Sequence, residues 1–372
     1  MFPQGRGQTC SKLPAMQLIE LTQQLMSIPS VSANRDECHR ALDWVIAQVG
    51  DLNGLYRHDF EYQGFRSVIF STRPERRTGL VLNAHLDVVP AHAHQFTPER
   101  RGDQLWGRGS YDMKGAAAVY LQLVRDLAAQ SPADRPDVQI QFVTDEEIGG
   151  HRGAERLVPE GFVGDFMIAG EPTNLDICYA AKGVYWVTVH LSGTPGHAAM
   201  PWQTQNPMGQ LSEGLARLLQ KYPAPDEAVW RTTATPTGIL AESSHNRVPD
   251  KVTLKIDIRR VPEHSQQEIQ ADLREFFPGA EIEVVQDSYA HYVDPANGWC
   301  VQLAELQEQL LGARPRFYRE HFASDARYWT HAGIPAVCWG PSGANMHADN
   351  EYLEVESLNL YHRLMSSWMN RF

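Results

Sequence analysis

Short apolar runs that alternate with a helical segment constrain the fold of this chain more than any other feature of its sequence. The runs Leu80–Leu82, Val138–Val143 and Phe166–Ala169 have the continuous apolar character of strands that are buried on both faces. Between the first two lies the Ala- and Leu-rich segment Gly115–Ala129, which is typical of a helix. Strands that alternate with helices form a mostly parallel sheet. The sequence therefore predicts an α/β domain.

A different pattern occupies the middle of the chain. Its segments follow in this order: strand Val184–Leu191, helix Pro207–Tyr222, strands Thr235–Ala241 and Lys251–Arg260, helix Ser265–Phe277 and strand Ala280–Val285. The strict alternation of apolar and polar residues in Lys251–Arg260 indicates a strand with one buried face. The order β-α-β-β-α-β is that of a ferredoxin-like module. We therefore expect an inserted domain at residues 179–291, a host domain at 16–178 and 292–372, and a loose N-terminal tail at 1–15.

Composition narrows the classes of partner. Against 33 Lys and Arg the chain has 45 Asp and Glu, a net charge of −12, which argues against nucleic acid and anionic membranes. No apolar window approaches the roughly 18 residues of a membrane span, and the first residues lack the apolar core of a secretion signal. The five cysteines are scattered and never spaced Cys-x-x-Cys. We therefore expect a cytoplasmic protein whose metal ligands, if any, are His and carboxylates.

Side chains that can bind a metal follow the predicted strands at their carboxyl ends. They are His85, Asp87, Glu146, Glu147 and Glu171, and Asp112 comes just before the predicted helix. The carboxyl ends of parallel strands form the ligand crevice of open α/β sheets, so these side chains can converge. Singly, each has a simpler explanation, because an Asp before a helix often caps it and adjacent Glu residues usually lie on a solvated face.

Together these residues suit a pair of zinc ions. Zinc accepts imidazole nitrogen and carboxylate oxygen, and two ions that share a carboxylate need roughly five protein ligands. The strand ends supply one His and several acids but no second His. The C-terminal segment Asn345–Glu351 supplies it as His347.

Taken in order, these motifs resemble those of the two-zinc amide hydrolases that include acetylornithine deacetylase, succinyl-diaminopimelate desuccinylase, aminoacylase and carboxypeptidase G. The similarity runs from about Leu18 to Leu360. It implies an α/β catalytic domain interrupted by a ferredoxin-like lid, through which two chains form a homodimer. It also implies two zinc ions, with cobalt or manganese as substitutes, bridged by Asp112.

The ligands that the resemblance implies form two sets that share one carboxylate: His85, Asp112 and Glu171 for one zinc, and Asp112, Glu147 and His347 for the other. Asp87 then orients His85, because a metal-bound imidazole usually donates its other N–H to a carboxylate. Glu146 matches the general base, which takes a proton from the attacking water and returns it to the leaving amine. A cis peptide is expected after Asp112.

The resemblance also implies residues that contact the substrate. His197, in the segment Gly196-His197-Ala198-Ala199 of the inserted domain, stabilises the oxyanion in the partner subunit's active site. The further substrate contacts that it implies are Asn246, Arg259, Ser324 and Asn345. Arg259 suits a substrate carboxylate because guanidinium is a planar bidentate donor. A solvated strand face is the alternative explanation of Arg259.

The reaction expected from the resemblance is hydrolysis of the amide of a small N-acyl amino acid with a free carboxylate, as in acetylornithine deacetylase. A dipeptidase, a carboxypeptidase or a succinyl-diaminopimelate desuccinylase would use the same centre. The segments Ala181-Lys182-Gly183 and Phe322–Asp325 depart from the desuccinylase pattern, whereas Gly340–His347 is similar to it. A non-catalytic scaffold is the alternative from another class. Its expected signature, the loss of a ligand or of the base, is absent from the sequence.

Overall fold

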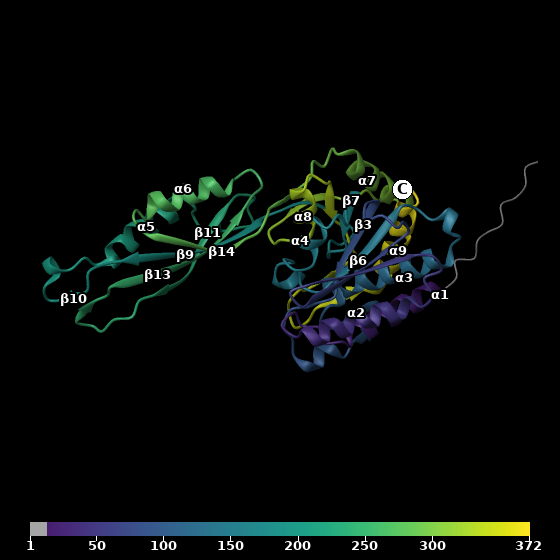
Figure 1. Cartoon of the computed structure of the whole chain (residues 1–372), viewed down its shortest axis with the longest axis horizontal. Coiled ribbons are helices and arrows are strands. Elements are labelled where there is room, and N and C mark those ends of the chain that lie inside the picture. The colour runs from purple at the N-terminus through teal and green to yellow at the C-terminus, as the bar shows by residue number, and fades with distance from the viewer. Residues whose placement is uncertain (1–12) are drawn as a thin grey trace, which may run out of the picture. The chain divides into compact units, whose positions relative to one another are not determined.

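The computed structural model describes residues 13–372, so most of the expected tail at 1–15 lies outside the described residues (Figure 1). The described chain forms two compact units. The first unit contains the residues up to Tyr179 together with Val293–Tyr318 and Ser324–Phe372. The second unit contains Ala180–Tyr292 and Arg319–Ala323.

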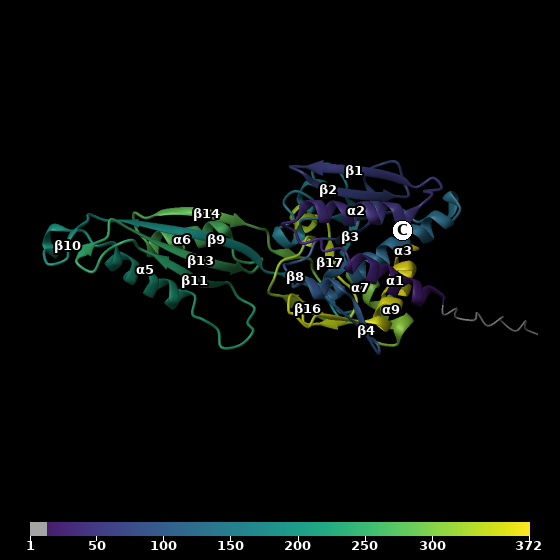
Figure 2. The same ribbon diagram turned by 90° about the horizontal axis from the view of Figure 1, so that it is seen from below.

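The main sheet has nine strands in the order β1-β2-β6-β3-β7-β17-β8-β15, with β16 paired to β8. Their bounds are β1 Tyr56–Tyr62, β2 Phe65–Ser71, β3 Thr78–His85, β6 Val138–Val143, β7 Gly164–Ala169, β8 Ile177–Ala181, β15 His291–Tyr292, β16 Phe317–Glu320 and β17 Ala336–Cys338. The central strands β6, β3, β7 and β17 are parallel, and the flanking pairs are antiparallel. Figure 2 shows β1 and β2 as a hairpin at one edge. The predicted α/β fold with a mostly parallel central sheet is confirmed.

Helices complete the first unit. They are α1 Leu13–Met26, α2 Arg35–Val49, α3 Gly115–Ala129, α4 Ala154–Leu157, α7 Gly298–Leu311, α8 Ala326–His331 and α9 Val355–Met369. The Ala- and Leu-rich helix α3 is the most buried, because it packs against α1, α2, α9 and strand β3. α8 packs against β7 and β17, and Leu157 of α4 packs on Ile69 and Val143 of the sheet.

A small antiparallel sheet, β18-β19-β5-β4, holds the loops that matter for the candidate site. Its strands are β4 Glu99–Arg101, β5 Gln104–Trp106, β18 Gly343–Ala344 and β19 Tyr352–Glu354. Other loops of the unit contain short helical turns: η1 Ala93–Phe96, η2 Ser110–Lys114, η3 Pro132–Asp134 and η4 Glu146–Ile148. Since β5 pairs with β19, the chain just after β5 and the chain just before β19 lie close together.

The second unit is a four-stranded antiparallel sheet, β11-β13-β9-β14, with α5 and α6 packed on one face (Figure 1). The bounds are β9 Gly183–Ser192, α5 Pro207–Lys221, β11 Thr233–Leu240, β13 Lys251–Arg260, α6 Gln266–Phe276 and β14 Glu281–Asp287. This is the β-α-β-β-α-β order expected from the sequence. The alternation of β13 is real, since Val252, Leu254, Ile256 and Ile258 are buried in the core of this unit.

Short elements outside the module complete the second unit. β10 Gly196–His197 pairs with β12 Arg247–Val248, and η5 covers Pro201–Gln203. Asn206 caps α5 by accepting a hydrogen bond from the Met208 N–H. Among the helices of residues 13–372, none is long and apolar enough to cross a membrane.

Candidate metal centre

The candidate ligands lie where the central strands end. His85 is the last residue of β3, Glu147 follows β6 in η4, and Glu171 follows β7. Asp112 lies in η2, directly before α3, and the Asp112–Met113 peptide is cis, as expected. Because β6, β3 and β7 are parallel neighbours, their carboxyl ends meet at one edge of the sheet.

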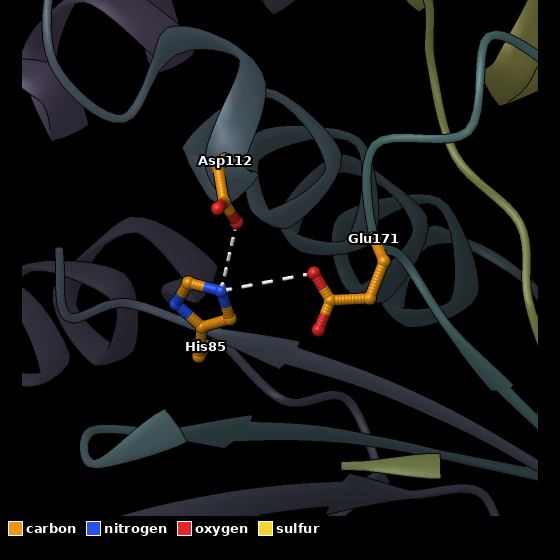
Figure 3. A group of neighbouring side chains, drawn as sticks. All are labelled: His85, Asp112 and Glu171. Carbon is orange, nitrogen blue, oxygen red and sulfur yellow. Dashed lines mark hydrogen bonds and ion pairs between the residues drawn. The ribbon is translucent and has the colours of Figure 1, made fainter. Parts of the chain in front are cut away.

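The first ligand set is buried. The Nε2 atom of His85 lies 3.1 Å from Asp112 Oδ1 and 3.9 Å from Glu171 Oε2 (Figure 3). One ligand atom from each of the three residues lies within 4.8 Å of the others. This spacing leaves room for one cation among an imidazole and two carboxylates.

The second ligand set shares Asp112 with the first. His347 Nε2 lies 3.1 Å from Asp112 Oδ2 and 3.1 Å from Glu147 Oε2. Asp112 therefore turns one carboxylate oxygen to each His, the arrangement of a carboxylate that bridges two cations. His347 differs from the other ligands because 48% of its side chain is exposed.

The Asp87 carboxylate lies closer to the N–H groups of the turn η4 than to the imidazole of His85. His85 Nδ1 lies 2.9 Å from the Asp87 backbone carbonyl and 3.6 Å from its carboxylate. The carboxylate itself accepts hydrogen bonds from the N–H groups of Glu146 and Glu147, both at 3.2 Å, and from the Ser32 hydroxyl. Asp87 thus fixes η4, while its main chain orients His85.

Glu146 lies beside the ligands without belonging to either set. Burial raises the pKa of Glu146 well above its ordinary value, and the carboxylates of Glu171 and Asp325 raise it further. The buried guanidinium of Arg327, whose Nη1 is 3.9 Å from Glu146 Oε1, acts in the opposite direction. A carboxyl with a raised pKa near a reacting water is suited to general base catalysis at neutral pH.

The polar groups of the second set fit a divalent cation. Burial and the adjacent Asp112 raise the pKa of Glu147, and hydrogen bonds to Asp112 and Glu147 raise that of His347 to about 10. The Glu147 Oε1 atom is buried and has no hydrogen-bond partner among the described residues. A desolvated carboxylate oxygen without a donor is unfavourable, and a cation satisfies it. Imidazole nitrogen with carboxylate oxygen is also a donor set that zinc accepts.

Comparison with known proteins identifies the family. A model described as "Peptidase family M20/M25/M40" matches residues 81–371, which include every candidate ligand. The chain belongs to peptidase family M20/M25/M40. It is a metallohydrolase of that family, whose members have a dinuclear metal site, and the candidate ligand groups of this chain share Asp112.

The proteins to which this chain is similar are named for several activities. A putative succinyl-diaminopimelate desuccinylase of Mycobacterium tuberculosis is 29% identical over 91% of this chain and 94% of its own. Aminoacylase-1A of Rattus norvegicus is 26% identical over 77% of this chain and 79% of its own. The crystal structure of aminopeptidase PepT from Bacillus cereus has the same fold, with a TM-score of 0.77 at 19% identity over 96% of this chain and 98% of that one.

Two predicted substrate residues of the first unit have different settings. The Ser324 hydroxyl is buried and lies 3.0 Å from the Cys338 sulfur. Asn345 is exposed, in the left-handed region with φ 63°, and its side chain donates to the Asn350 carbonyl. Neither residue belongs to a ligand set, and the substrate contacts predicted for them stay predictions.

The predicted residues of the second unit lie in two places: His197 is on the two-stranded sheet β10-β12, and Arg259 is on β13 of the four-stranded sheet. His197 is exposed on β10, and the Ala198 N–H donates to the Asn246 carbonyl, which brings His197 and Asn246 together. Arg259 pairs with Val184 at the opposite end of β13 from Lys251, the residue that pairs with Ser192 ahead of β10.

Arg259 lines a pocket of about 200 Å³ within the second unit, together with Lys182, Thr233 and His321. Its guanidinium donates to both carboxylate oxygens of Asp257, at 2.8 and 3.1 Å. The lining of the pocket therefore combines this partly neutralised guanidinium and the Lys182 ammonium group with the carboxylate of Glu227.

Three buried charges near the centre escaped the sequence analysis. Arg327 follows two residues after Phe322–Asp325, the segment compared with the desuccinylase pattern, and no role was predicted for it. Arg108 and Glu351 lie inside the motifs quoted for Asp112 and His347, yet the sequence shows no reason to single them out. The available signal was a charged residue in a Gly-rich or ligand-bearing loop, which is weak without knowledge of burial.

Proposed function

We propose that this chain hydrolyses the amide bond of a small N-acyl amino acid or peptide with a free carboxylate, at a centre of two zinc ions bridged by Asp112. The observation that carries the proposal is the pair of ligand sets that share Asp112, with Glu146 beside them and outside both. Family membership supports the hydrolytic chemistry.

The relatives bear on the substrate. Their names favour N-succinyl amino acids and short peptides over the acetylornithine deacetylase-like substrates that the resemblance implies. Lys182 stands where the desuccinylase pattern has an Arg, and an ammonium group still provides a positive charge for a second carboxylate. We therefore place N-succinyl amino acids and dipeptides ahead of N-acetyl amino acids in the proposal.

The positions of the side chains support the roles that we propose for them. Two zinc ions, when bound, polarise the amide carbonyl and lower the pKa of a water molecule. Glu146 takes the proton of the attacking water and delivers it to the leaving amine. Its burial favours this role, because a carboxyl with a raised pKa can both accept and return a proton near neutral pH.

The second unit supplies substrate contacts in this proposal. His197 donates a hydrogen bond to the developing oxyanion in the active site of a partner subunit, and the chain acts as a homodimer. The exposure of His197 and its fixed place on β10 support this role. Arg259 holds the substrate carboxylate in its pocket, where that carboxylate competes with Asp257 for the guanidinium.

One experiment tests the proposal. Purified protein is analysed for metal content and assayed for amine release from N-succinyl amino acids, N-acetyl amino acids and dipeptides, before and after chelation. We expect two zinc ions per chain and release that stops on chelation and returns with zinc. Absence of metal after zinc supplementation, together with no release from any substrate, would favour a non-catalytic scaffold. The ranking of the three substrate groups decides between deacylase and peptidase.

A further inference from the structure

A buried ion pair lies beside the candidate metal centre without contacting its ligand atoms. Arg108 and Glu351 have side chains that are 2% and 0% exposed, and Arg108 Nη1 lies 2.6 Å from Glu351 Oε2. Arg108 lies between β5 and η2, and Glu351 directly precedes β19. Removal of two charges from water costs several kcal/mol for each ion, so such a pair is weak evidence for a role in stability alone.

Glu351 binds the turn that carries the bridging carboxylate. Its Oε1 accepts hydrogen bonds from the N–H groups of Tyr111 at 2.9 Å and Asp112 at 3.1 Å, and its Oε2 accepts one from Gly109 at 3.1 Å. Asp112 has non-helical backbone angles, φ −115° and ψ 99°, so this turn does not provide the regular hydrogen bonds of a helix. The Glu351 carboxylate supplies acceptors for buried N–H groups that need them.

Arg108 binds the segment that carries the exposed ligand. Its Nη2 donates to the His347 carbonyl at 3.0 Å. His347 has φ 65°, in the left-handed region, which is uncommon and unfavourable for a residue with a side chain. With 48% of the His347 side chain exposed, packing holds its ring only in part. The hydrogen bond to its carbonyl therefore fixes the position from which the imidazole projects.

The two hydrogen-bond groups form one continuous link. It runs from the Asp112 N–H through the Glu351 carboxylate and the Arg108 guanidinium to the His347 carbonyl. Its ends are the main chains of two ligands whose side chains lie 3.1 Å apart. His85 needs no such link, because its side chain is only 1% exposed and it is the last residue of β3.

We propose that Arg108 and Glu351 are a positioning pair that sets the distance between Asp112 and His347, and thereby the affinity of the second metal site. This inference rests on the metal centre of the proposed function and does not depend on which amide is cleaved. The pair touches neither metal nor substrate and acts through the ligands. Its loss weakens the site of Asp112, Glu147 and His347 before that of His85, Asp112 and Glu171.

The test measures zinc affinity rather than turnover. Zinc-free protein is titrated with Zn²⁺ in competition with a chromogenic chelator, and thermal unfolding is recorded with and without zinc. The variants are Glu351→Gln, Arg108→Met and the conservative Arg108→Lys. Arg135→Met is the matched control, because Arg135 is also buried and donates hydrogen bonds to the carbonyls of Asn53 and Gln130. Arg135 shortly precedes β6, whereas Glu146 follows the other end of that strand.

We expect two tight zinc sites in the unaltered chain. Glu351→Gln and Arg108→Met weaken the site of Asp112, Glu147 and His347 by about 10- to 100-fold, the usual range for outer partners of a metal site, and weaken the site of His85, Asp112 and Glu171 less. Arg108→Lys restores part of the loss because it keeps the charge. The double variant is less affected than the product of the two single effects, since both remove the same link. Arg135→Met lowers thermal stability but keeps both zinc affinities.

Two results overturn the inference. One is that Glu351→Gln and Arg108→Met both keep the two affinities of the unaltered chain. The other is that both sites weaken together, in step with the melting temperature, as expected of a merely structural pair. An unaltered chain that binds no zinc refutes the metal centre of the proposed function instead. If Glu351→Gln fails to fold, the two Arg108 variants carry the same test.

Discussion

The two units differ in how they place the residues that carry chemistry. In the first unit, ligands from the ends of β3, β6 and β7 converge, most of them buried, until their donor atoms lie 3.1 to 3.9 Å apart. In the second unit, exposed His197 lies on the two-stranded sheet β10-β12, whereas Arg259, which is paired with Asp257, lies on β13 of the four-stranded sheet. A metal site must be preorganised because its charges are costly to bury unpaired. Contacts to a substrate need to converge only when it binds.

The largest effect that would sharpen this comparison is expected from Glu146, the proposed general base in the first unit. Glu146→Gln should lower turnover by about 10²- to 10⁴-fold, because the amide cannot accept the proton of the attacking water. Metal content should stay the same, since Glu146 belongs to neither ligand set. Steady-state kinetics and elemental analysis measure both, with Glu155→Gln on α4 as the control. Zinc loss in step with activity would assign Glu146 to the ligands instead.

The next effect concerns His197 of the second unit. His197→Ala should lower kcat by about 10²- to 10³-fold if the imidazole stabilises an oxyanion. Co-expression with Glu146→Gln chains should restore activity, because one mixed dimer then contains one complete site. His190→Ala, on the face of β9 where His190 contacts Thr253 and Glu283, is the matched control. If the mixture stays inactive, His197 does not act across subunits.

A smaller effect is expected at Arg259, on β13 of the four-stranded sheet. Arg259→Lys should raise KM by about tenfold with little change in kcat, because Lys keeps the charge but loses the bidentate geometry. Substrates without a free carboxylate should not distinguish the variant from the unaltered chain. Arg274→Lys on exposed α6 is the control. A fall in kcat at constant KM would show that Arg259 serves the reaction step rather than carboxylate binding.

The smallest effect separates stability of the second unit from chemistry. Ser265 caps α6 and forms a capping box with Glu268. Ser265→Ala should lower stability by about 1 kcal/mol and leave kcat and KM unchanged. Thermal unfolding and the kinetic assay measure the two quantities side by side. A loss of activity here would mean that α6 takes part in substrate binding.

Local sequence patterns were sufficient to predict the long helices and strands but not the short strands. The alternation in β13 and the buried run of β3 are visible in the sequence, because each strand is long and each face has one environment. The strands β4 and β19 of the small four-stranded sheet have only three residues each, which is too short to show a periodic pattern in the sequence. The hairpin strand β1 was missed because it is exposed and polar along most of its length.

The candidate site divides in the same way. His85, Glu147 and Glu171 were predictable because strand ends meet at one edge, and the resemblance supplied their roles, which remain predictions. The Arg108–Glu351 pair was not predictable, because its members are 243 residues apart and only the folded chain shows their burial. The resemblance implied the Asp87 carboxylate as the partner of His85, whereas the backbone carbonyl of Asp87 lies closer to the imidazole.

The strands at the unit boundary have a consequence for protein engineering. Ala181 of β8 lies directly opposite His291 of β15, so the chain leaves the main sheet and returns to it at adjacent positions. Closure of two ends that already pair needs only a hairpin turn, with a two-residue Asn-Gly loop as the usual choice. The whole insertion can then be deleted by one short splice, giving a minimal protein that retains every candidate ligand and lacks His197 and Arg259.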